Sequence, residues 1–166
     1  MPFTSTSSLT AADVNNFLRG LVRDNTTYTK TGAATETDLA STTITGGTIT
    51  ATGGIYIVAA GTVTNSAAGA KTIDLKFGAT NIATVSRTGA NAQDWLIEAW
   101  EFNTATNAQR WVVRYSTTDA TTITGDYITS AIDTTANVIL KLTGELANGA
   151  DTITQNAFDV FVVQIT

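Results

Sequence analysis

Two neighbouring segments, residues 94–103 and 109–117, read as strands that are apolar on both faces. Side chains on a strand alternate between its two faces. The apolar side chains of the first segment divide into Trp95, Ile97 and Ala99 on one face and Leu96, Trp100 and Phe102 on the other. A strand with this pattern is covered on both sides. The chain must therefore form a β-sheet with one face in a core and a second cover over its outer face.

The polar residues between the two segments predict a hairpin whose turn is centred near Thr106. With that centre, Glu98 lies opposite Arg114, and Trp100 lies opposite Val112. The predicted interior face consists of Trp95, Ile97, Ala99, Val113 and Tyr115. The predicted outer face consists of Leu96, Trp100, Phe102 and Val112 around the Glu98–Arg114 pair. We predict that another subunit covers this outer face; the alternative is that the N-terminal segment of the same chain folds over it.

The last predicted strand, residues 157–165, is also apolar on both sides. Its two faces are Phe158, Val160 and Val162 on one side and Phe161, Val163 and Ile165 on the other. We assign Phe158, Val160 and Val162 to the predicted subunit interface. That interface then comprises seven residues in all, namely Leu96, Trp100, Phe102, Val112, Phe158, Val160 and Val162.

Nearly everything after Glu36 has the pattern of short strands separated by turn residues. The predicted strands are Thr37–Ile44, Ile55–Thr64, Ala70–Phe77, Asn81–Val85, Asp94–Asn103, Gln109–Thr117, Asp126–Ile132, Asn137–Leu146 and Ala157–Ile165. Short strands at this spacing, without helical periodicity between them, favour a sandwich or barrel. Their number suits a jelly roll. We predict an all-β, antiparallel jelly-roll sandwich over residues 35–166.

The first 34 residues predict a separate anchor segment with a short helix and a polar linker. Thr10 is a suitable helix N-cap, and the apolar residues that follow recur at helical spacing. These residues are Val14, Phe17, Leu18, Leu21 and Val22. A helix of this length with an internal glycine is marginal alone in water, so something must hold it. We predict that these residues dock into a neighbouring protein and so attach the β-domain to a particle; the alternative is that the helix packs on its own β-domain.

Composition excludes several classes of function. The chain has no cysteine and no histidine, a formal net charge of -5 and a pI of about 4.4. Without thiols or imidazoles the usual metal ligands and the usual general base are missing, and we expect no metal site and no cofactor. An acidic chain with scattered basic residues lacks the footprint of a nucleic-acid binder. No apolar run reaches the length of about 18 residues that spans a bilayer, so we expect no membrane partner.

The carboxylates do not form a catalytic pattern. Glu98 and Glu101 are three residues apart on one predicted strand and point to opposite faces, whereas glycosidases need two facing carboxylates. A Ser-His-Asp triad is impossible without histidine. We therefore predict that the protein is not an enzyme.

Four segments between residues 35 and 165 resemble the jelly-roll structural proteins of tailed bacteriophages. The segments are the "KTIDLKFG" strand at Lys71–Gly78, the "WLIEA" strand at Trp95–Ala99, the "NAQRW" strand start at Asn107–Trp111 and the closing "LTGELANGADTIT" at Leu142–Thr154. The resemblance implies a homotrimer in an arrangement like that of tumour necrosis factor. It implies a head decoration, a head fibre or a tail component, located in the virion. Of these we predict a capsid decoration or head-fibre protein, whose partner is the major capsid protein or another virion protein.

Two further expectations concern location and an alternative function. The first ten residues lack the basic and apolar regions of a secretory signal, so we expect synthesis in the host cytoplasm. The alternative function is a tail-associated carbohydrate- or receptor-binding module. Such a module should present aromatic rings from turns, but all three tryptophans lie within predicted strands, and Phe77 is the one large ring beside a turn.

Overall fold

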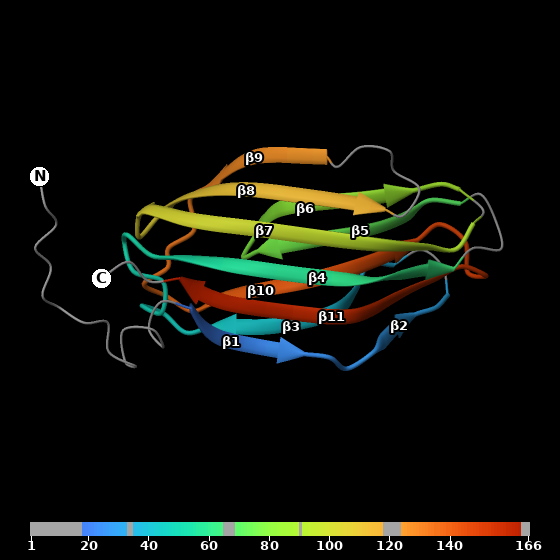
Figure 1. Cartoon of the computed structure of the whole chain (residues 1–166), viewed down its shortest axis with the longest axis horizontal. Coiled ribbons are helices and arrows are strands. Elements are labelled where there is room, and N and C mark those ends of the chain that lie inside the picture. Colours follow the sequence, from blue (N-terminus) through green and yellow to red (C-terminus); the bar gives the residue numbers. More distant parts are fainter. Residues whose placement is uncertain (1–17, 33–34, 65–68, 90, 118–123, 164–166) are drawn as a thin grey trace, which may run out of the picture.

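The computed structural model describes residues 18–32, 35–64, 69–89, 91–117 and 124–163. All secondary-structure elements among these residues are β-strands, and all strand pairs are antiparallel. The strands form two sheets that pack face to face as a β-sandwich (Figure 1). The prediction of an all-β antiparallel fold is therefore confirmed.

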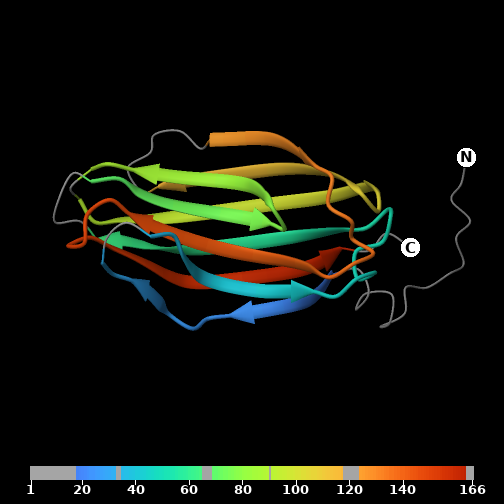
Figure 2. The same cartoon turned by 180° about the vertical axis from the view of Figure 1, so that it is seen from behind.

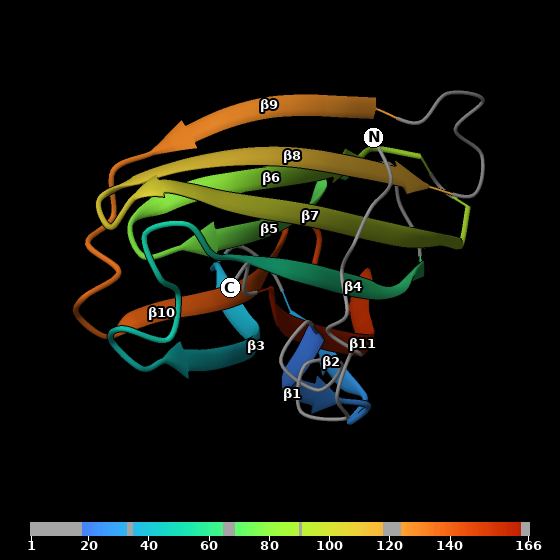
Figure 3. The same cartoon turned by 60° about the vertical axis from the view of Figure 1, so that its left-hand side comes forward.

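The larger sheet has seven strands in the order β1-β11-β4-β7-β8-β9, and β2 also pairs with β11. Their bounds are β1 Leu18–Asp24, β2 Tyr28–Lys30, β4 Gly54–Thr64, β7 Gln93–Ala105, β8 Ala108–Thr117, β9 Thr124–Ser130 and β11 Thr152–Val163. The sheet runs from β1 at one edge to β9 at the other, and the turned view of Figure 3 shows the same two edges.

The smaller sheet has four strands in the order β3-β10-β5-β6. Their bounds are β3 Thr37–Ile44, β10 Val138–Leu146, β5 Lys71–Phe77 and β6 Thr80–Arg87. Seen from behind, this sheet lies in front of the larger one (Figure 2). The four-stranded sheet has too few strands to cover the seven-stranded sheet fully. Strand β9 forms the edge of the larger sheet that lies opposite the β1 edge.

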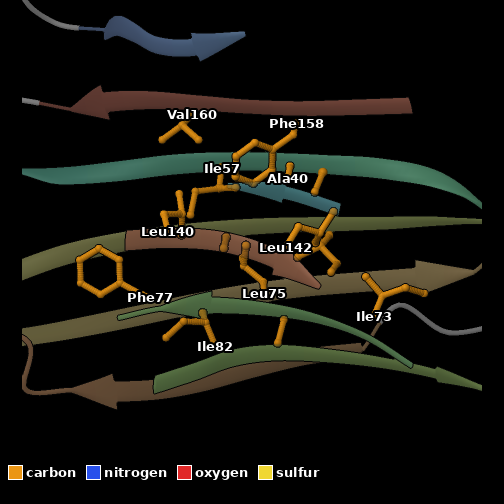
Figure 4. Packing of buried hydrophobic residues seen from close by; sticks show 14 of the residues in the cluster. Ala40, Ile57, Ile73, Leu75, Phe77, Ile82, Leu140, Leu142, Phe158 and Val160 are labelled. Carbon is orange, nitrogen blue, oxygen red and sulfur yellow. The ribbon is translucent and has the colours of Figure 1, made fainter. Parts of the chain in front are cut away.

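The core lies between the two sheets and is made of alternate residues of nearly every strand. Its fully buried members include Ile57, Ala59, Ile73, Leu75, Phe77, Ile97, Trp111, Leu140, Leu142 and Val160. Figure 4 shows several of them, among them Ile57, Leu75 and Leu140, converging from both sheets. The ring of Phe77 packs edge-on against the ring of Trp111, with centroids 5.2 Å apart. Phe77 is therefore a core residue and not an exposed ring at a turn.

The predicted hairpin is confirmed residue by residue as β7 and β8. Glu98 pairs with Arg114, and Trp100 pairs with Val112. On the predicted interior face Trp95, Ile97, Ala99 and Val113 are buried, and Tyr115 is half-buried against the core. The alternation of the sequence therefore determines the orientation of this strand pair correctly.

The predicted N-terminal helix is wrong where the structure describes it. Residues Leu18–Asp24 form strand β1, which pairs antiparallel with β11. Of the predicted anchor residues, Leu21 and Val22 pack against the core of the sandwich. The backbone of Leu18 pairs with Val163, and Val14 and Phe17 lie outside the described residues. Strands β1 and β2 thus belong to the sandwich, and the predicted boundary near residue 34 is corrected.

The assignment of Phe158, Val160 and Val162 to a subunit interface is also corrected. Their side chains are at most 2% exposed, because this face of β11 is turned toward the four-stranded sheet. Phe158 and Val160 lie inside the cluster of Figure 4. The opposite face of β11, with Phe161 and Val163, is only half-buried. The prediction that β11 has two apolar faces was right. It assigned the face of Phe158, Val160 and Val162 to a subunit interface, but that face lies in the core.

Candidate functional site

The outer face of the seven-stranded sheet is largely apolar from β11 to β9. The strand registers place one residue of each strand in a row, in which Phe161 pairs with Tyr56, Tyr56 with Trp100, Trp100 with Val112, and Val112 with Tyr127. More apolar residues flank this row on the same face. We call the whole set the aromatic face, which comprises Tyr56, Val58, Leu96, Trp100, Phe102, Val112, Tyr127, Phe161 and Val163.

Three rings of the aromatic face form a stack across neighbouring strands. Tyr56 lies parallel-displaced on Trp100, with ring centroids 5.0 Å apart and an angle of 24° between the planes. Phe161 stacks on the other side of Tyr56, with centroids 6.1 Å apart and an angle of 23°. Stacked aromatic pairs contribute about 0.5–1.5 kcal/mol beyond the burial of their area. The stack therefore holds these rings in fixed positions on the surface.

Glu98 lies within the aromatic face and is held by two partners. The Tyr56 hydroxyl donates a hydrogen bond of 3.0 Å to Glu98 Oε1, and Arg114 Nη1 lies 3.9 Å from Glu98 Oε2. Burial and, next, the hydrogen bond to Glu98 raise the pKa of Tyr56, so its hydroxyl stays protonated and able to donate. The ion pair is partly exposed and stabilises the single chain by about 0–1 kcal/mol.

The outer face of the four-stranded sheet has the opposite character. Asp74 accepts hydrogen bonds from Asn81 and Thr84, and Lys76 pairs with Glu36. Lys141 pairs with Asp38 at 3.1 Å. One large apolar side chain, Ile139, is exposed on this sheet among the described residues, at 52%. Among the described residues the two outer faces of the sandwich thus differ, since one is largely polar and the other carries the aromatic face.

Larger exposed apolar side chains concentrate on the aromatic face. Phe102 is 46% exposed, Val112 is 45% exposed and Tyr127 is 63% exposed. Single exposed apolar residues are normal on a soluble protein, whereas contiguous apolar patches mark interaction sites. These three residues share a face with the aromatic stack, so they form a patch and not scattered positions.

A glutamate lies buried directly beneath this face. Glu101 follows Trp100 on β7, points to the core and is 1% exposed. Neither of its carboxylate oxygens has a donor in hydrogen-bond geometry among the described residues. Burial raises the pKa of Glu101 from 4.5 to about 8. The carboxyl is therefore largely neutral at neutral pH, because a charge at this position would lack solvation.

Next to Glu101, a network of hydrogen bonds fixes the turn end of the β7–β8 hairpin. The Gln109 side chain donates to Asn103 Oδ1 at 3.2 Å and to the Ile132 carbonyl at 2.9 Å. Its Oε1 accepts from Ser130 and from the Ile132 amide. The Trp111 indole donates to Ser130 at 3.0 Å. These buried bonds tie β9 and the following loop to the hairpin, and so hold one end of the aromatic face rigid.

The two sheets each carry a surface groove near the residues discussed above. One of about 390 Å³ adjoins Leu96 on the aromatic face and is also lined by Ala60, Thr62, Asp94, Ser116 and Asn156. The other, of about 450 Å³, lies near Ile139 and Lys141 on the four-stranded sheet. The first groove has one carboxylate in its lining, Asp94, and the second has two, Asp38 and Asp133. In the part of the chain that the structure describes, no three metal-ligating side chains come together.

The structure brings together four of the residues predicted for an interface, Leu96, Trp100, Phe102 and Val112, on one face. Sequence reasoning missed Tyr56, Tyr127 and Phe161 as members of that face. A signal for Tyr56 was present, since β4 alternates buried Ile55 and Ile57 with half-buried Tyr56 and Val58. Residues 55–58 thus repeat the two-sided pattern that was recognised in residues 94–103.

No helix among the described residues is both long enough and apolar enough to cross a membrane. No protein-family model and no curated protein matches the chain. Solved structures that resemble it include lectin II from Ulex europaeus, at 12% identity and a TM-score of 0.35, covering 68% of this chain and 74% of the lectin. A second is the lectin UEA-II complexed with galactose, at 12% identity and a TM-score of 0.34, covering 68% and 73%. At these scores the likeness concerns the β-sandwich and carries no argument about function.

Proposed function

We propose that this chain is a non-enzymatic structural protein of a virion that assembles into a homotrimer through its aromatic face and decorates a capsid. The observation that carries the proposal is the contrast between the two outer faces of the sandwich. One is polar and suits water, and the other presents a stacked aromatic row flanked by exposed Phe102 and Val112. A sheet with apolar side chains on both faces needs a cover on both.

The energy of such a contact is sufficient for stable assembly. Full burial of one large apolar side chain stabilises by roughly 1.5–3 kcal/mol. Several half-buried residues of the aromatic face would each contribute part of that amount. Their sum must exceed the cost of association, which is estimated at about 4–15 kcal/mol. The face has enough large side chains to meet this requirement, and the fixed stack lowers the entropy lost on binding.

A second copy suits this face because its charges balance. Arg114 and Glu98 lie at its centre as a pair, and at its edge the backbone of Arg23 pairs with that of Asp159. The whole chain carries a net charge of -5, so copies repel one another through most of their surface. The repulsion between copies is least at a face without net charge. In a contact through this face, the Glu98–Arg114 pair would help to select the correct partner and register.

The virion role and the finer architecture rest on the resemblance of the sequence to jelly-roll proteins of tailed phages. In this proposal the protein is made in the host cytoplasm and located in the virion, and its partners are its own copies and the major capsid protein. Contact with the particle is assigned to the residues before β1, which include Val14 and Phe17. Neither nucleic acid nor a membrane is a partner.

A tail-associated carbohydrate- or receptor-binding module is the second candidate. It is favoured by the stack of Tyr56 and Trp100 beside the polar groups of Glu98 and Arg114, since sugars pack on flat rings and bond to such groups. In that case the same face would be covered by a glycan and the protein would stay monomeric.

The test replaces Trp100, at the centre of the face, with a charge. In the Trp100→Glu variant we expect the wild-type assembly to dissociate, measured by sedimentation velocity. The matched control is Ile139→Glu, which places the same charge on the exposed polar sheet and should leave the mass unchanged. Val112→Glu, at a 45% exposed position, serves if the loss of the Trp100 stack impairs folding. Retention of the wild-type mass by both face variants would refute the proposal.

A further inference from the structure

Strand β9 is an exposed sheet edge that lacks the usual protection. It has the sequence TGDYITS and pairs only with β8 among the described strands. Figure 1 and Figure 3 both place it at the margin of the sandwich. Edge strands present unpaired amides and carbonyls, and natural proteins shield them with bulges, lysines, prolines or very short lengths. β9 contains no lysine, arginine or proline.

The other edge strands show such protection. The pairing of β1 has a bulge between Gly20 and Val22, and β1 carries arginines at positions 19 and 23. The pairings of β3 and β6 each contain a register shift. β2 is three residues long and includes a lysine. In contrast, β9 keeps an unbroken register with β8 from Thr124 to Ser130. Among the described edge strands, β9 is therefore the one whose pairing is regular and free of a register shift.

The sequence of β9 is compatible with itself in an antiparallel pair. Tyr127 is its central residue, so a two-fold axis at this position sets Tyr127 opposite Tyr127 of the partner subunit. The one charged residue, Asp126, then lies opposite Ile128 of the partner subunit and not opposite another carboxylate. Gly125 would lie opposite Thr129 of the partner subunit. No like charges meet, and an aromatic pair forms at the centre, which is a stabilising cross-strand combination.

We propose that two copies of the chain join edge to edge through antiparallel pairing of their β9 strands about a two-fold axis at Tyr127. The large sheets of the two copies then form one continuous sheet. Tyr127 is the most exposed of the large apolar side chains described, at 63%, and the contact would cover it. Backbone hydrogen bonds give the affinity of such strand addition, and the side chains give the register.

This contact goes beyond the proposed function and is independent of it. The aromatic face is a surface of the sheet, whereas β9 offers the edge of the sheet, so both can be used at once. If the two-fold axes cross the three-fold axis at right angles, the two contacts together give the closed symmetry of two joined trimers. If the aromatic face instead binds something else, the β9 contact alone gives a dimer.

The test uses cysteine trapping, which is clean here because the chain has no cysteine. Directly opposed residues of an antiparallel pair have Cα atoms about 4.5–5.5 Å apart, within the range that a disulfide spans. The full chain with Tyr127→Cys is incubated with oxidised glutathione, and cross-linked dimer is followed on non-reducing gels. The control is Ile139→Cys, a comparably exposed position on the other sheet. We expect Tyr127→Cys to cross-link at least tenfold faster.

A second pair of variants tests the register. Gly125→Cys mixed with Thr129→Cys should give the heterodimer in preference to either homodimer. Equal cross-linking rates for Tyr127→Cys and Ile139→Cys would overturn the proposal. A preference for another register would overturn the two-fold axis at Tyr127. Tyr127 also belongs to the aromatic face, whereas Gly125→Cys and Thr129→Cys leave every residue of that face in place. The second pair of variants therefore distinguishes failure of the β9 contact from failure of the aromatic face as an assembly surface.

Discussion

Lys71 and Asp151 form an ion pair inside the sandwich, with Nζ and Oδ2 3.1 Å apart and both side chains fully buried. The pair joins the start of β5 to the residue that precedes β11. The Lys71 ammonium also donates a hydrogen bond of 3.1 Å to the Gly89 carbonyl. It thus fixes one end of the core through contacts that no apolar side chain could supply.

Removal of one partner of this pair should destabilise the protein severely. Lys71→Ala removes the ammonium that pairs with the buried Asp151 carboxylate, for which the expected cost is about 3–5 kcal/mol in the free energy of unfolding. The double variant Lys71→Met with Asp151→Leu should recover most of this loss. Lys141→Ala breaks the exposed pair with Asp38 and should cost only about 0–1 kcal/mol. Urea titration measures all three; similar costs for Lys71→Ala and Lys141→Ala would contradict the burial of the first pair.

The stability of the protein should fall as the pH rises from about 4.5 to about 8, because of Glu101. Its pKa is raised from 4.5 to about 8 in the folded chain, so between these values the folded state holds a proton that the unfolded state has released. The stabilisation is complete at low pH and is lost as the pH rises. A pKa difference of one corresponds to about 1.4 kcal/mol, so the effect amounts to a few kcal/mol.

The variant Glu101→Gln isolates this effect. Its free energy of unfolding should decline less than that of the wild type between pH 5 and pH 8. Glu145→Gln makes the same chemical change at an exposed position of β10 and corrects for the loss of one carboxylate. Parallel pH profiles for the wild type and Glu101→Gln would show that Glu101 is not buried as a neutral acid.

The sequence predicted the strands well because their alternation is regular and their turns carry recognisable residues. Residues 37–44 were predicted without error, and the register of β7 with β8 followed from one assumed turn centre. The separation of Glu98 from Glu101 onto opposite faces was also predicted correctly. When both faces of a strand are apolar, alternation alone does not show which face lies in the core. For this reason the core face of β11 was wrongly predicted to lie at a subunit interface.

The first strand was mistaken for a helix for a specific reason. A bulge between Gly20 and Val22 breaks the alternation of β1, and both Leu21 and Val22 pack toward the core. Together with Leu18 these residues imitate the i, i+3, i+4 spacing of a helix. The pairing with β11 that overrides this local pattern joins segments about 140 residues apart, and such tertiary context regularly overrides local propensity. Alternation does place Glu101 on the interior face of β7 with Ile97 and Ala99, but the environment that raises its pKa is tertiary and has no local signal.

The mass of the wild-type chain in solution tests the central claim most directly. Light scattering coupled to size-exclusion chromatography at micromolar concentration should give three times the chain mass of 17.3 kDa, or a multiple of that trimer if the β9 edges also pair. A clean monomer of 17.3 kDa would contradict the account, since the aromatic face would then stand uncovered in water. A dimer would contradict the trimer, and the Tyr127→Cys cross-link would then show whether the dimer forms through β9.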